Sequence, residues 1–204
     1  HPPVQLPDGP VVGADRLRHS IHGTTFSRAW QIDRADDSSA ELSCRLDGAL
    51  GWNFGGVARQ RITVAPRRLT CTLSVESDDR PFPATVGWHP WFVAPEQLET
   101  HPVAMYELDE VAMPTGRLDS VTPGPWDDCF VNHEPVTMVV DGVEVTISSA
   151  CTHWVVYDEP DHATCVEPQT GPPDAFNIAP RIIQRFGSAT AGFRLDAALS
   201  RRRE

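Results

Sequence analysis

The sequence contains no lysine: all 17 of its basic residues are arginine, set against 28 aspartate and glutamate residues. A lysine nucleophile, a lysine Schiff base and a phosphate-loop lysine are therefore excluded. The formal net charge of −11 also argues against nucleic acid or an anionic membrane as a partner, because both require a basic surface.

Long apolar runs are missing as well. No stretch approaches the ~20 apolar residues that a membrane span needs, and the opening HPPVQLPDGP lacks a charged-then-apolar signal pattern. We therefore expect no membrane insertion, and secretion finds no support. The length of 204 residues and an apolar content of 40% predict one globular domain over residues 1–204.

The five cysteines, at positions 44, 71, 129, 151 and 165, are odd in number and show no CxxC spacing. This pattern argues against a disulfide framework and a zinc knuckle, so we predict free thiols packed as small apolar side chains in a reducing, cytoplasmic location. The eight histidines show no HxH or HExxH spacing, and no metal or cofactor is predicted, although distant ligands could still converge in space.

Nineteen prolines and 14 glycines leave little room for long helices. Instead, apolar side chains recur at every second position in 42–46, 58–64, 70–76 and 143–148, the period of a β-strand. Asp141-Gly142, just before the last run, is a hairpin turn signal. These patterns predict an all-β protein, a large antiparallel sandwich or barrel of at least about eight strands. A dinucleotide or P-loop site is excluded, because no strand is followed by a glycine loop and a helix.

Four segments break this alternation with polar, aromatic and turn residues: 21–24 (IHGT), 87–92 (GWHPWF), 126–130 (WDDCF) and 165–174 (CVEPQTGPPD). Flat aromatic faces beside a proton donor, as in Trp88, His89 and Trp91, suit a sugar ring, whose C–H faces pack on aromatics. The alternative is that both tryptophans fill the core and a backbone carbonyl satisfies His89. Since no GxSxG elbow occurs and Cys165 lies in an apolar run, the remaining chemistry is acid–base catalysis by His and Glu.

Taken in order, His22-Gly23, GWHPWF, DDCF at 127–130 and CVEPQTGPPDAFN at 165–177 resemble the aldose 1-epimerase (mutarotase) family. The segments GWNFGG at 51–56 and MPTG at 113–116 are similar to further family motifs, and the resemblance runs from about residue 17 to residue 197. It implies a large antiparallel β-supersandwich of the galactose mutarotase type. It also implies the interconversion of the α and β anomers of a free hexose without a cofactor.

The resemblance also implies roles for single residues. Glu167 would be the general base that takes the proton of the C1 hydroxyl, and His89 the general acid that protonates the ring oxygen. His22 would hydrogen-bond the sugar near the ring oxygen. Asp127, with the adjacent Asp128 as the alternative, would accept hydrogen bonds from ring hydroxyls. A pH optimum near neutrality follows from a base that is ionised and an acid that still carries its proton.

Trp88, Trp91 and Gln169 complete the expected sugar-binding residues, with Gly, Pro and Thr near Glu167 fixing the loop that carries the base. The family places an Asn-Arg segment before its His-Gly motif, whereas Arg16 and Arg18 do not lie in such a segment. If early strands are missing, a second copy of the chain could cover the exposed edge strands as a homodimer. Two alternatives stay open: a carbohydrate-binding or sugar-sensing protein without turnover, and a hexose-phosphate 1-epimerase, which needs a cationic phosphate pocket.

Overall fold

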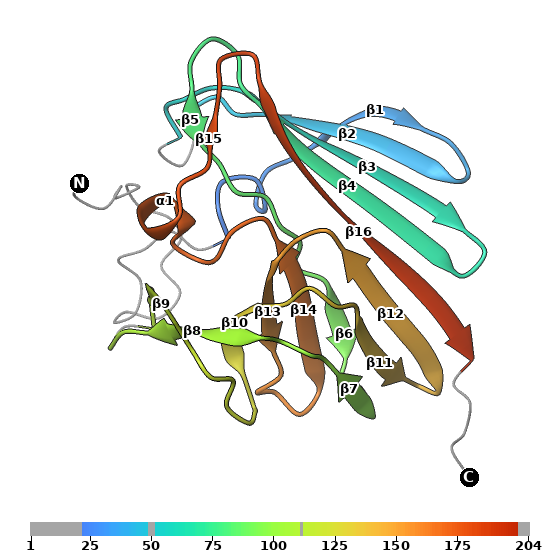
Figure 1. Cartoon of the computed structure of the whole chain (residues 1–204). Coiled ribbons are helices and arrows are strands. Elements are labelled where there is room, and N and C mark those ends of the chain that lie inside the picture. The colour runs from blue at the N-terminus through green and yellow to red at the C-terminus, as the bar shows by residue number, and fades with distance from the viewer. Residues whose placement is uncertain (1–21, 49–51, 111, 200–204) are drawn as a thin grey trace.

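The structure, a computed structural model, describes residues 22–48, 52–110 and 112–199. Within them the chain forms 16 strands and one four-residue helix, α1 (Ala175–Ile178). Eight strands build the larger antiparallel sheet (Figure 1), in the order β1 (Gln31–Ala35), β2 (Ser39–Arg45), β3 (Val57–Ala65), β4 (Arg68–Glu76), β16 (Ser188–Leu199), β12 (Val143–Ser149), β11 (Val136–Val140) and β7 (Gln97–Glu99).

Six strands build the smaller antiparallel sheet, in the order β6 (Trp91–Val93), β14 (Ala163–Gln169), β13 (His153–Tyr157), β10 (Asp127–Val131), β8 (Ala104–Leu108) and β9 (Pro114–Asp119). A third, two-stranded sheet pairs β15 (Ile182–Ile183) with β5 (Phe82–Pro83). The predicted all-β antiparallel class is confirmed.

The alternating runs in the sequence become strands because a strand turns successive side chains to opposite faces. Runs 58–64, 70–76 and 143–148 fall within β3, β4 and β12, and run 42–46 matches β2 except for its last residue. The hairpin between β11 and β12 turns at Asp141 and Gly142, both of which have positive φ (50° and 73°), as a type I′ turn requires.

The half of the larger sheet that contains β11 and β12 lies beside the smaller sheet (Figure 1). Side chains of both sheets form one buried apolar cluster. Met138 and Ile147 of the larger sheet meet Trp154 and Val166 of the smaller one there. Each such side chain contributes roughly 1.5–3 kcal/mol when it is fully buried. The inner face of the smaller sheet therefore packs in the core, and its outer face can carry polar side chains.

Glu167 lies within strand β14, where the sequence analysis expected a loop. The Pro168 carbonyl accepts a hydrogen bond from the Trp88 N–H (3.2 Å), which lies before the start of β6. Because the N and C=O of a residue in an antiparallel strand point to the same side, the missing N–H of Pro168 also faces Trp88, and no bond to β13 is lost. The base predicted from the sequence is therefore held by two neighbouring stretches of chain rather than by a flexible loop.

The five cysteines are buried free thiols, as predicted. In the part of the chain that the structure describes, no helix is long and apolar enough to cross a membrane. Arg16 and Arg18 lie outside the described residues.

Gly56, which precedes β3, has a positive φ of 107°, and a Cβ placed there would lie 2.5 Å from the Glu76 carbonyl oxygen. We predict that Gly56→Ala lowers the free energy of unfolding by about 2–4 kcal/mol, since the backbone and a steric contact both oppose the methyl group. Gly142→Ala is the matched control: its φ is also positive, but nothing lies within 4 Å of the added Cβ. Urea unfolding should therefore show a clearly smaller loss of unfolding free energy for Gly142→Ala than for Gly56→Ala. Equal losses for the two variants would contradict the steric argument.

Candidate active site

Glu167 lies on the face of the smaller sheet that points away from the core. Its neighbour Val166 belongs to the core cluster, so strand alternation turns Cys165, Glu167 and Gln169 to the opposite face. Even so, only 8% of the Glu167 side chain is exposed. A carboxyl group buried to this degree needs a partner.

The partner is His89, and strand register brings it there. Trp91 pairs with Cys165, and Gly87 forms an isolated bridge with Gln169, so His89 stands opposite Glu167 between the two pairs. The distance from His89 Nε2 to Glu167 Oε1 is 3.2 Å. At this distance the imidazole and the carboxyl group are close enough for one proton to serve both.

The electrostatics of the site favour the neutral form of both groups. The pKa of Glu167 is raised to about 8: burial is the main cause, the hydrogen bond from Gln169 opposes it, and the charge of Asp127 adds to it. The pKa of His89 is lowered, first by burial and then by the charge of His22. Both directions favour a pair that carries a single proton at neutral pH.

Gln169 fixes the second carboxyl oxygen of Glu167. Its side-chain Nε2 donates a hydrogen bond to Glu167 Oε2 at 3.2 Å. The Gln169 side chain passes over Gly87, where an added Cβ would lie 2.8 Å from Gln169 Cγ. Glycine at position 87 therefore provides the space that lets Gln169 reach the carboxyl group.

Aromatic rings surround the pair in a continuous series. His22 lies edge-on to His89 with ring centroids 4.9 Å apart, and Phe26 lies edge-on to His22 at 5.5 Å. Trp91 stacks on His89 with centroids 5.5 Å apart and planes 16° apart, and its side chain is half exposed. Tyr157 meets the edge of Trp91 at 5.8 Å. An exposed indole beside an acid–base pair is a surface on which a sugar ring can pack.

The other residues expected to bind sugar lie in different surroundings. Asp127 pairs with Tyr157, which pairs with Cys165, so Asp127 shares the face of Glu167, whereas strand alternation turns Asp128 to the other face. Trp88 packs against Phe193 among the core side chains, with centroids 5.1 Å apart. Of the two aspartates, Asp127 is thus the one aligned with the pair, and Trp88 lies apart from it.

The sequence analysis missed Cys165, which it placed among the core thiols. Its Sγ, a ring nitrogen of His89 and a carboxylate oxygen of Glu167 all lie within 4.8 Å of one another. The spacing of Cys165 and Glu167 contained the signal, because positions two apart in a strand share a face. Burial raises the pKa of the Cys165 thiol to about 12, with further contributions from Glu167 and Asp127, so the thiol is protonated at neutral pH.

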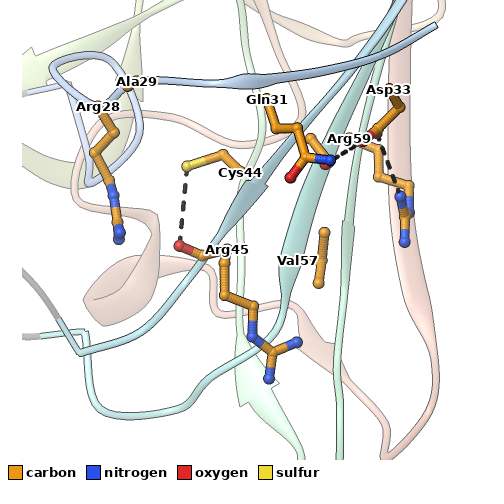
Figure 2. Close-up of a pocket in the computed structure, with 9 residues that line it drawn as sticks. Arg28, Ala29, Gln31, Asp33, Cys44, Arg45, Val57 and Arg59 are labelled. Carbon is orange, nitrogen blue, oxygen red and sulfur yellow. Dashed lines mark hydrogen bonds and ion pairs between the residues drawn. The ribbon is translucent and has the colours of Figure 1, made fainter.

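A separate depression of about 520 Å³ lies over β1, β2 and β3 (Figure 2). It contains three arginines, and each already has a carboxylate partner: Arg28 with Asp47, Arg45 with Asp78, and Arg59 with Glu76. Because these charges are balanced, the depression does not favour a phosphate group.

Comparison with known proteins identifies the family of this chain. The sequence profile of the family described as aldose 1-epimerase matches residues 10–192. The chain belongs to this family. The resemblance inferred from the motifs is therefore confirmed, and so is the predicted enzyme class, since the members are isomerases. No curated protein matches the chain.

Solved structures support the same fold. A protein from Escherichia coli K12, provisionally named an aldose 1-epimerase, aligns with a TM-score of 0.79 and 16% identity over 92% of this chain and 75% of that chain. A galactose mutarotase-like protein from Clostridium acetobutylicum gives 0.72 at 15% identity, over 83% of this chain and 66% of that one. Galactose 1-epimerase from Lactobacillus acidophilus NCFM aligns with a TM-score of 0.72 and 12% identity, over 85% of this chain and 68% of that chain. The predicted galactose mutarotase-like sandwich is thereby confirmed.

The contact between Gly87 and Gln169 generates a prediction. Gly87→Ala should lower the free energy of unfolding by about 1–3 kcal/mol, because the added methyl group overlaps the Gln169 stem. In a Gln169→Ala background, Gly87→Ala should lower the free energy of unfolding clearly less, because the Gln169 Cγ that the methyl group overlaps is absent. Urea unfolding of the two single variants and the double variant measures this coupling. An equal cost of Gly87→Ala in both backgrounds would show that the overlap is not what makes glycine necessary.

Proposed function

We propose that the protein is a mutarotase that interconverts the α and β anomers of a free hexose, with His89 and Glu167 as its acid–base pair. The observation that carries this proposal is the 3.2 Å contact between His89 Nε2 and Glu167 Oε1 in a buried, aromatic-lined site. Membership of the aldose 1-epimerase family and the position of Asp127 on the same face support it.

The reaction needs one proton acceptor and one proton donor at the same time. The base removes the proton from the C1 hydroxyl, the C1–O5 bond breaks as C1=O forms, and the acid protonates O5. Rotation about C1–C2 then presents the other face of the aldehyde, and ring closure returns both protons. Each correctly positioned group contributes typically ~10²–10⁴ in rate, because neither a free alkoxide nor an oxonium ion has to form.

A pair that shares one proton fits this scheme. In one arrangement the carboxylate is the acceptor and the imidazolium the donor, and in the other the roles are exchanged. Ring opening converts the first arrangement into the second, and ring closure converts it back, so the proton count of the pair is restored in each cycle. Glu167 acts as the base for the C1 hydroxyl and His89 as the acid for O5, with His22 beside His89 and Asp127 toward the ring hydroxyls.

A free sugar is favoured over a sugar phosphate. Among the described residues no arginine forms an ion pair with Glu167, and the arginines of the depression in Figure 2 are paired with carboxylates. Parallel assays with D-glucose and D-glucose 6-phosphate separate the two substrates.

The decisive experiment is polarimetry on freshly dissolved α-D-glucose and α-D-galactose. We predict that the wild type speeds the decay of optical rotation well beyond the buffer rate. Glu167→Gln and His89→Ala should each lose about 10²-fold or more of this gain, because each lacks one partner of the pair. His162→Ala, which removes an exposed histidine outside the site, should keep it. Sugar binding without turnover in the wild type would instead support the carbohydrate-binding alternative.

The rate should depend on pH in a bell-shaped manner. Below the lowered pKa of His89, under 6.5, both groups carry protons and no base remains; above the raised pKa of Glu167, about 8, neither carries one and no acid remains. Initial rates corrected for the buffer reaction should therefore fall on both sides of neutrality. A rate that stays constant from about pH 7 to about pH 10 would contradict the shared-proton pair.

A further inference from the structure

Three side chains of the outer face of the smaller sheet form a metal-ligating donor set, and only two of them belong to the proposed acid–base pair. His89, Cys165 and Glu167 offer a nitrogen, a sulfur and an oxygen atom, all within 4.8 Å of one another. We propose that this set binds a thiophilic divalent cation of the Zn²⁺ class, and that the bound cation blocks the sugar reaction.

The spacing of the three atoms is close to that of a zinc site. Zinc bonds of about 2.0–2.3 Å in a tetrahedron place neighbouring ligand atoms roughly 3.3–3.7 Å apart. His89 Nε2 and Glu167 Oε1 are 3.2 Å apart, so these two atoms already have nearly this separation. The Sγ of Cys165 lies within 4.8 Å of the other two ligand atoms, so it has to approach by no more than about one ångström.

Two paired segments of chain hold the three ligands in place. Cys165 and Glu167 are two positions apart in β14 and share one face, and His89 stands opposite Glu167 between two cross-strand pairs. Three ligands fixed by one hydrogen-bonded ladder lose little conformational freedom when a cation binds. The donor set is therefore preorganised.

The surroundings also favour a cation. Gln169 Nε2 holds Glu167 Oε2, which leaves Oε1 free to act as a single carboxylate ligand. Asp127 stands on the same face, in the row of Cys165, and adds a negative charge. A thiolate, an imidazole and one carboxylate match the preferences of Zn²⁺ and Cd²⁺, whereas Mg²⁺ prefers a shell of oxygen ligands.

Binding at this site is incompatible with mutarotation. The cation would take the lone pairs of His89 Nε2 and Glu167 Oε1, the two atoms that exchange protons with the sugar in the proposed reaction. Three protein ligands leave the fourth position to water or to a sugar hydroxyl. Zn²⁺ should therefore act as an inhibitor. The binding itself stands on the ligand geometry, and only the inhibition rests on the proposed function.

The test uses Co²⁺ as a spectroscopic probe on the full chain. A thiolate ligand to Co²⁺ gives a near-ultraviolet charge-transfer band, which we expect for the wild type and expect Zn²⁺ to abolish. Cys165→Ala should lack the band. Cys129→Ala is the matched control and should retain it, because Cys129 is also a buried thiol on this face but is separated from Glu167 by Val155 of β13. Cys165→Val preserves the packed volume if the alanine variant does not fold.

The activity arm uses the same proteins. For the turnover that Cys165→Ala retains, measured against its own metal-free rate, the Zn²⁺ concentration for half-inhibition should rise at least about tenfold. A Co²⁺ band that persists in Cys165→Ala, or that is absent from the wild type, would overturn the metal site. A band in a wild-type protein that does not turn over sugar would leave the site standing and overturn only the proposed function.

Discussion

The site depends on one constraint: a carboxyl group is buried on a β-sheet face with no described arginine in contact with it. Burial disfavours the charged form of Glu167, and the imidazole of His89 is the group that can share its proton. Water on this face would screen the contact and release the proton. The aromatic rings around His89 are therefore part of the electrostatics of the site as well as of its shape.

Sheet register turns this constraint into geometry. Two pairs place His89 directly opposite Glu167: the cross-strand pair of Trp91 with Cys165 and the bridge of Gly87 with Gln169. A register shift of one residue would turn His89 toward the core and Trp88 toward Glu167, which would abolish the pair. The packing of Trp88 against Phe193 opposes that shift, so the core cluster and the acid–base pair stabilise the same register.

Much of this structure could be predicted from the sequence, because period-two alternation reports directly on strands. Runs such as 70–76 became strands, and the motifs around His89 and Glu167 identified the family. The sequence analysis was wrong about the loop around Glu167. Proline and glycine nearby suggested that the strand ends there, but strand β14 continues through Pro168, whose carbonyl bonds to the Trp88 N–H. It could not choose between Asp127 and Asp128 or link Cys165 to His89, because both depend on which strands are neighbours. Adjacency of distant segments is a property of the folded sheet and leaves no local pattern.

The place of β6 at the edge of the smaller sheet has a dynamic consequence. This strand has three residues and, among the described residues, pairs only with β14, whereas Glu167 lies in a strand that is bonded on both sides. Hydrogen exchange and local opening begin at such edges with free energies well below that of global unfolding. His89 can thus leave Glu167 while the rest of the sandwich stays intact. On warming, the acid–base pair should separate first, and catalytic competence should end at a lower temperature than the fold.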